Sequence, residues 1–187
     1  IRDTATSTYE YSPMLTKESV VNKDGTIDYT VVFYNTIPGS GGDDGYITAA
    51  VDKLWFNDTF DERLEYVPGS LMVTGYSPWQ KDLWLAKFVY NGSVTGNTIR
   101  VLAEDLVFYD YNEEANYHGW NGLSGADNFK DYYSWVNHGG RFEFTYKLKI
   151  KDEYYYTTEE NVFVFDNTAE LTWDADGSSG PVTDTAY

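Results

Sequence analysis

The sequence predicts an all-β protein built as an antiparallel β-sandwich. Short runs of alternating apolar and polar residues recur along the chain and are separated by polar turn sequences, a pattern typical of a sandwich. Tyr, Phe and Trp favour the half-buried surface of a pleated sheet, and the chain holds 18 Tyr, 10 Phe and 6 Trp in 187 residues. Because this length supplies enough residues for one core, we expect a single domain over residues 1–187.

The first part of the chain is expected to form strands joined by tight turns. The NKDG sequence at 22–25 and the VPGS sequence at 67–70 are turn signals. The strand that follows NKDG places Ile27, Tyr29 and Phe33 on one face. The expected strands cover residues 15–20, 26–35, 47–60 and 71–74, with a flexible loop at 36–46.

Residues 75–140 are less regular and rich in aromatic side chains, so we expect an irregular insertion in the sandwich there. Ile99, Val101 and Ala103 alternate and indicate one strand. The apolar residues of 129–136 follow helical spacing, which would allow one short helix.

The last part of the chain contains the clearest strand pattern. In residues 141–151, apolar residues alternate strictly with Glu, Thr and Lys. A further strand is expected around Asn167. The glycine- and serine-rich sequence that follows predicts an exit linker over 174–187.

Three polar residues, Lys17, Asp58 and Asn167, lie where the alternation predicts core positions. The apolar residues in phase with them are Leu15 for Lys17, Leu54, Phe56 and Phe60 for Asp58, and Phe163, Phe165, Ala169, Leu171 and Trp173 for Asn167. A buried ammonium, carboxyl or amide is costly when it is alone. If the three groups meet, they supply a nucleophile, an acid and an acyl acceptor.

Three segments carry a resemblance to a known family. LTKESVVNKDGTIDYTVVFYN, FNDTFDERLEYVPGS and FVFDNTAELTW resemble the signature strands of the immunoglobulin-like domains that form isopeptide bonds in Gram-positive pilins and adhesins of the collagen-adhesin type. The matching regions are 14–74 and 141–173. The resemblance implies that Lys17 is the amine, Asn167 the acceptor and Asp58 the catalytic acid. It also implies an extracellular structural domain on the bacterial cell wall, in a stalk or pilus shaft beside other domains of the same protein.

The chemistry of such a bond can be stated from the residues themselves. An amine attacks a carbonyl only when it is unprotonated, and apolar burial lowers the pKa of a lysine. Burial raises the pKa of an aspartate, so Asp58 would stay protonated, hydrogen-bond the Asn167 carbonyl and pass protons to the departing ammonia. The reaction would turn over once, without a cofactor, so the chain is not expected to be an enzyme in the ordinary sense.

Each of the three residues also has an ordinary structural interpretation. Lys17 alone can extend its ammonium into water, Asp58 can cap a turn, and Asn167 can lie in an edge strand or a bulge. All three residues lie at predicted core positions, and they follow one another in the order that the resemblance requires. This combination favours the bond. The less suitable substitutes are Lys23 in the NKDG turn, Asn161 before the apolar run and Asp52 before the apolar part of its strand.

The acidic composition restricts the partners of the chain. A formal net charge of -17 argues against nucleic acid and anionic membranes. The absence of cysteine excludes disulfides and thiolate metal sites. We find no signal peptide, transmembrane run or anchor in the sequence, so we expect a fragment of a longer protein that does not itself contact a membrane.

Metal binding and hydrolysis are weaker interpretations of this sequence. The acidic loops NKDGTID, GGDDG and DADG are better explained as solvated turns than as Ca²⁺ sites, and His118 and His138 as surface residues. We therefore assign no metal. Glu113 and Glu114 are paired carboxylates, but nothing places them across a cleft.

A second function class rests on the tryptophans of the middle region. Aromatic platforms bind sugars by stacking, so a carbohydrate or another host ligand would be held by Trp79, Trp84, Trp120 and Trp135. Filling of the core by large aromatic residues is the ordinary interpretation of these four residues, and we prefer it.

Overall fold

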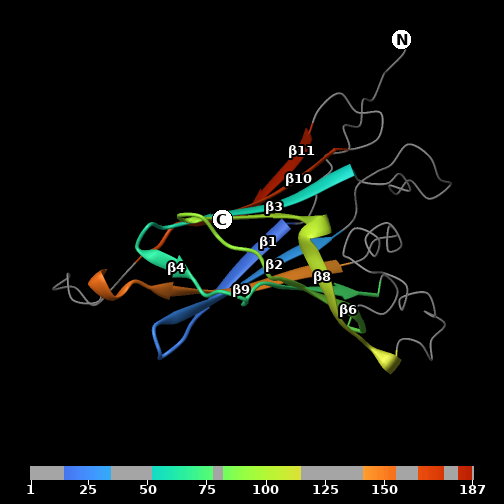
Figure 1. The fold of residues 1–187 in the computed structure, drawn as a ribbon, viewed down its shortest axis with the longest axis horizontal. Coiled ribbons are helices and arrows are strands. Elements are labelled where there is room, and N and C mark those ends of the chain that lie inside the picture. Colours follow the sequence, from blue (N-terminus) through green and yellow to red (C-terminus); the bar gives the residue numbers. More distant parts are fainter. Residues whose placement is uncertain are drawn as a thin grey trace, which may run out of the picture.

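The computed structural model describes residues 15–34, 52–77, 82–114, 141–154, 164–174 and 181–186, and it is an antiparallel β-sandwich (Figure 1). The strands are β1 (Leu15–Val21), β2 (Thr26–Tyr34), β3 (Asp52–Phe60), β4 (Leu64–Tyr66), β5 (Met72–Tyr76), β6 (Trp84–Tyr90), β7 (Thr98–Leu102), β8 (Leu106–Tyr111), β9 (Arg141–Ile150), β10 (Asn167–Asp174) and β11 (Pro181–Ala186). The 3₁₀ segments η1 (Ala103–Asp105) and η3 (Asp152–Tyr154) are single turns. The predicted fold class is confirmed.

Two sheets form the layers of the sandwich. The larger sheet has the order β1-β2-β9-β5-β6-β8, with β4 also paired to β9, and the smaller sheet has the order β11-β10-β3-β7. Figure 1 shows β3, β10 and β11 as one layer above β2 and β9. β9 is the centre of the larger sheet because β2 pairs with one of its edges and β4 and β5 share the other.

The core between the sheets follows the alternation read from the sequence. In β9 every second residue is buried, from Phe142 to Ile150. The NKDG and VPGS turns form as expected, and Gly25 and Gly69 adopt φ values of 81° and 75°, a left-handed conformation that favours glycine. Aromatic rings dominate the interior, and Phe33, Phe56, Phe88, Phe142 and Phe144 are all below 2% exposed.

Residues 75–140 contain more regular structure than the sequence predicts. The strand near Ile99 is confirmed as β7, but β6 and β8 were missed. Register shifts interrupt the pairing of β6 with both neighbours, and β8 exposes Val107 and Tyr109. Both features hide the two-residue period by which a strand is recognised.

The exit linker predicted at 174–187 is wrong for its last part, because residues 181–186 form β11. This strand pairs with β10 from Ala169↔Ala186 to Asp174↔Pro181. Its Val and Thr residues are β-branched, which favours a strand. The loop predicted at 36–46 and the short helix predicted at 129–136 lie outside the described residues. Among the described residues, no helix has the length and apolar character that crossing a membrane requires.

Candidate functional site

Lys17 lies in β1, at the edge of the larger sheet, and its side chain enters the core. Its backbone is opposite Val31 of β2, and its side chain is only 3% exposed. The ammonium nitrogen Nζ lies 2.6 Å from Oδ2 of Asp58 and 5.2 Å from the centre of the Tyr29 ring. Lys17 does not extend into water, so that ordinary interpretation of the residue is wrong.

Asp58 lies in β3 of the smaller sheet and faces Lys17 across the core. The residue is 0% exposed, and its Oδ2 accepts hydrogen bonds from Lys17 and, at 2.6 Å, from the Tyr146 hydroxyl. Its other oxygen, Oδ1, is buried without a hydrogen-bond partner. Because Asp58 is inside a strand and fully buried, the interpretation of this residue as a turn cap is wrong.

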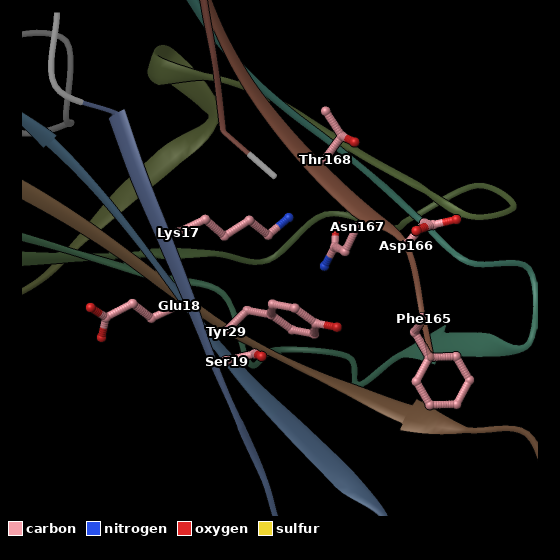
Figure 2. A pocket seen from close by; sticks show the side chains of 8 residues that line it. All are labelled: Lys17, Glu18, Ser19, Tyr29, Phe165, Asp166, Asn167 and Thr168. Carbon is pink, nitrogen blue, oxygen red and sulfur yellow. The ribbon is translucent and has the colours of Figure 1, made fainter. Parts of the chain in front are cut away.

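Asn167 is the first residue of β10 and lies beside Asp58. β10 pairs with β3 so that Asn167 is opposite Phe60 and Asp58 is opposite Ala169, which places Asn167 and Asp58 diagonally on one face of the sheet. Asn167 is 8% exposed. Its Nδ2 donates to the Tyr146 hydroxyl at 3.3 Å, whereas its Oδ1 is buried without a partner. In Figure 2 the side chains of Lys17 and Asn167 point toward one another.

The structure therefore brings Lys17, Asp58 and Asn167 to one buried place, and it adds two tyrosines that sequence reasoning missed. Tyr29 of β2 and Tyr146 of β9 are directly opposite in the larger sheet. Their rings stack with centroids 5.4 Å apart and an interplanar angle of 10°. The signal in the sequence was that both tyrosines fall at core-facing positions of their strands. A buried tyrosine hydroxyl usually has a hydrogen-bond partner, so two tyrosines on a buried face indicate polar groups nearby.

Burial is the main influence on the charges of this site. Desolvation lowers the pKa of the Lys17 ammonium, against the attraction of Asp58. Desolvation raises the pKa of the Asp58 carboxyl, against the attraction and the hydrogen bond of Lys17. Both directions favour the neutral forms, an amine beside a carboxylic acid. Desolvation also raises the pKa of the Tyr146 hydroxyl, which keeps its proton.

A pocket of about 520 Å³ adjoins Lys17 and Asn167. Its lining residues are Lys17, Glu18, Ser19, Tyr29, Phe165, Asp166, Asn167 and Thr168 (Figure 2). Because Glu18, Ser19 and Asp166 are exposed, the pocket reaches solvent. A small molecule such as ammonia therefore has a route from Asn167 to the outside.

Of the three substitute residues, only Lys23 has a described side chain, and it lies away from this site. Lys23 is exposed in the turn between β1 and β2. Asp52 begins β3, six residues before Asp58, and its side chain is outside the described residues, as is the whole of Asn161. Glu113 and Glu114 are exposed.

The predicted ligand-binding tryptophans are mostly outside the described part of the chain. Trp84 alone among the four is described; it is half-buried in β6, where the Lys87 ammonium lies 4.5 Å from its ring centre. Trp79, Trp120 and Trp135 are not described, and neither are His118 and His138. Within the described ranges, no group of His, Asp and Glu side chains is arranged to hold a metal ion. The ligand site stays a prediction.

The fold and the buried polar group together define a class: an antiparallel β-sandwich with a lysine, an aspartate and an asparagine buried between its sheets. No family model and no curated protein matches the sequence. Among solved structures, the chain is similar to BcpA, the major pilin subunit of Bacillus cereus, with a TM-score of 0.52 and 12% identity over 94% of this chain and 39% of that one. A variant of the same pilin gives a TM-score of 0.50 and 11% identity, with the same coverage.

The collagen-binding domain of the surface protein RspB from Erysipelothrix rhusiopathiae is also similar, with a TM-score of 0.46 and 14% identity over 94% of this chain and 46% of that one. At these identities the BcpA structures show a shared fold. The present chain spans less than half the length of the BcpA chain.

Proposed function

We propose that this chain is a structural domain of a bacterial cell-surface pilus or adhesin, strengthened by an isopeptide bond that forms spontaneously between Lys17 and Asn167. The observation that carries the proposal is the 2.6 Å contact between the Lys17 ammonium and Asp58 inside the core, beside the Asn167 amide. A lone buried ion pair adds little stability. A buried amine, acid and amide in contact supply the reactants of an amide transfer.

The charge state of the pair decides whether the amine can attack. Lys17 and Asp58 can exist as an ammonium beside a carboxylate or as an amine beside a carboxylic acid. Both forms hold the same number of protons, so they are two forms of one protonation state of the pair. Burial shifts both pKa values toward the second form. In that form Lys17 has the free electron pair that the reaction requires.

The two buried oxygens without partners support the same assignment. Oδ1 of Asp58 and Oδ1 of Asn167 are both acceptors, and a buried acceptor without a donor is costly. A proton on Asp58 would give this carboxyl a donor for the Asn167 carbonyl. That hydrogen bond would polarise the carbonyl for attack, as an acid catalyst does.

The product would be one amide bond and one ammonia per chain, so the domain would act once and on itself. The bond would join positions 150 residues apart (167 minus 17). By analogy with a disulfide that closes a loop of this order, the bond would add about 4–5 kcal/mol to the free energy of unfolding. It would also connect the two sheets covalently, since Lys17 is in β1 and Asn167 in β10.

The location and the partners follow from this role. A domain of a pilus shaft or adhesin stalk works outside the cell, attached to the cell wall, and contacts neighbouring domains of its own protein. The shared fold with a pilin supports this assignment, and the net charge of -17 suits an exposed surface in water.

The intact mass of the purified, folded domain tests the proposal. We expect a mass below the sequence mass by one ammonia, and tandem mass spectrometry should find a branched peptide that links Lys17 to Asn167. Lys17→Ala and Asn167→Ala should each restore the full mass. The matched controls are Lys23→Ala, in the exposed turn, and Asn57→Ala, which precedes Asp58 in β3 and is only half-buried; both should keep the loss. Full mass in folded, unsubstituted protein would exclude the bond.

A further inference from the structure

We propose that Tyr146 is a catalytic residue of this reaction, whose hydroxyl carries a proton from Asp58 to the departing nitrogen of Asn167. This inference rests on the proposed function, because it assigns a step of the same bond formation. It differs from the direct transfer by Asp58 that the sequence suggests. The tyrosine would be the group that protonates the leaving ammonia.

A continuous row of polar contacts carries the inference. Lys17 Nζ lies 2.6 Å from Asp58 Oδ2, the Tyr146 hydroxyl lies 2.6 Å from the same oxygen, and Asn167 Nδ2 lies 3.3 Å from that hydroxyl. The attacking nitrogen and the departing nitrogen are thus at the two ends of one row. The hydroxyl of Tyr146 occupies the position between the carboxyl and the amide nitrogen.

The reaction needs one net proton transfer along this row. As the Nζ–Cγ bond forms, the Asn167 carbonyl electrons move to Oδ1, which takes the proton that Asp58 already holds, and Nζ gives a proton to Asp58 Oδ2. Nδ2 then has a free electron pair, because it is no longer conjugated with the carbonyl. Tyr146 donates its hydroxyl proton to Nδ2 and takes the proton of Asp58. The carbonyl re-forms as Oδ1 returns its proton to Asp58, the Cγ–Nδ2 bond breaks and ammonia leaves, with Asp58 and Tyr146 in their initial protonation states.

Tyr146 has the properties that a relay requires. A phenolic hydroxyl can donate one hydrogen bond and accept others at the same time. Tyr146 is 3% exposed, and its ring is held between Tyr29, at 5.4 Å, and the edge of Phe56, at 6.1 Å. β9, which carries it, is an inner strand of the larger sheet. The hydroxyl is therefore fixed in place, so the transfer needs little rearrangement.

Tyr146→Phe tests the relay, because it removes the hydroxyl and keeps the ring. The protein is synthesised in a cell-free system, synthesis is stopped, and the ammonia loss is followed by intact mass. We expect bond formation to be slower by about 10²-fold, at the lower end of the usual contribution of general acid–base catalysis. The matched control is Tyr90→Phe, which removes another buried tyrosine hydroxyl, one that donates to the Ser93 carbonyl; its rate should equal that of the unsubstituted protein.

The outcomes separate the two proposals. An unsubstituted protein that loses ammonia, together with a Tyr146→Phe variant that loses it equally fast, would overturn the relay and leave the bond intact. An unsubstituted protein that keeps its full mass would overturn both.

If the Tyr146→Phe variant does not fold, a second measurement can still test the relay. A fluorinated tyrosine at position 146 keeps the ring and the hydroxyl but makes the phenol more acidic. A relay makes the rate of bond formation depend on this acidity, whereas a tyrosine that only fills space does not. We expect a changed rate for fluorotyrosine at position 146 and an unchanged one at position 90. Equal rates at both positions would overturn the relay.

Discussion

Two pairs of aromatic residues on the same two strands show how an apolar part of the core differs from the part that holds the buried polar site. Phe33 and Phe142 are opposite each other in β2 and β9, and so are Tyr29 and Tyr146, four residues away on the same face. Both pairs stack, at 6.2 Å and 5.4 Å between ring centroids. The backbone, the strand pairing and the ring packing are alike, so the main chemical difference within the pairs is two hydroxyl groups.

The polar groups around each pair account for the difference. The tyrosine pair adjoins Lys17, Asp58 and Asn167, which come from three other strands. A hydroxyl in that place has partners, whereas a phenylalanine at position 146 would remove one hydrogen bond from the Asp58 carboxyl and one from the Asn167 amide. The buried polar site is thus a small change of side-chain chemistry in an ordinary sandwich core, and variants of the two regions should differ in their effect on bond formation.

Loss of Asp58 should have the largest effect on the reactive region. Asp58→Ala leaves both reacting groups in place but removes the acid, so we expect bond formation to slow by about 10²–10⁴. Asp58→Asn should act in the same way, because an amide donates hydrogen bonds but cannot relay a proton. Intact mass followed over time after cell-free synthesis measures the rate.

The control for this prediction is Asp61→Ala, which removes an aspartate that directly follows β3 and is paired with Arg63. Its rate of bond formation should equal that of the unsubstituted protein. A normal rate in Asp58→Ala would show that the Asp58 carboxyl is only structural, and Asp52 would then be the acid to test.

Loss of the bond itself should have the next largest effect. Asn167→Ala removes the acceptor, so the domain should fold without the covalent loop and lose about 4–5 kcal/mol of unfolding free energy. Chemical denaturation measures this loss, and the melting temperature and trypsin resistance should fall with it. If Asn167→Ala unfolds at the same denaturant concentration as the unsubstituted domain, the bond does not contribute to stability.

A hydroxyl added to the phenylalanine pair should have a smaller effect on stability and none on bond formation. Phe142→Tyr places a hydroxyl in a ring pair that is 0% and 1% exposed without adding a carboxyl or an amide beside it. We expect a loss of about 1–3 kcal/mol in the free energy of unfolding, while the intact mass still shows the ammonia loss. An unchanged stability would mean that the two pairs are interchangeable and would remove the basis of the comparison.

The smallest effect should be a pH dependence confined to the reactive region. In Asn167→Ala, Lys17 and Asp58 stay unlinked and titrate. The raised pKa of Asp58 gives stability that is present below about pH 3.8 and is lost as the pH rises through the folded-state pKa. The lowered pKa of Lys17 gives stability that is present above about pH 10.5 and is lost as the pH falls through its folded-state pKa.

The two contributions together should make the pair least favourable near neutral pH, with a slope of about 1.4 kcal/mol per pH unit inside each window. The reference is the same variant with Lys17→Met and Asp58→Asn added, whose other charges are unchanged. The difference in unfolding free energy between the two proteins, measured from acid to alkaline pH, should pass through a minimum. A flat difference would contradict both pKa directions.

The sequence predicted those parts of this structure in which one face of a strand is buried. β2, β9 and the start of β10 alternate cleanly, because one side meets the core and the other meets water. The same alternation predicted the site residues Lys17, Asp58 and Asn167, because each is a polar residue at a position where the pattern predicts an apolar one. β6 and β8 were missed because register shifts and exposed apolar residues disturb their alternation.

Tyr146 shows which part of the site the alternation of apolar and polar residues cannot predict. A tyrosine at a core position fits an apolar pattern, so the period gives no sign that its hydroxyl bonds to Asp58. That contact depends on the pairing of β9 with β2 and on the distance between the two sheets. Neither can be read from one strand.

β11, which the sequence presented as a linker, has a mechanical consequence. The proposed bond between Lys17 and Asn167 would enclose residues 18–166 in a covalent loop, and tension along the chain would pass from residue 17 to residue 167 without stretching them. β11 lies outside this loop and pairs with β10 along the edge of the smaller sheet. A pull from its far end would separate its six residues pair by pair and lengthen the chain by roughly 20 Å. The edge strand would yield first and absorb a sudden load, and the amide bond would set the limit of extension.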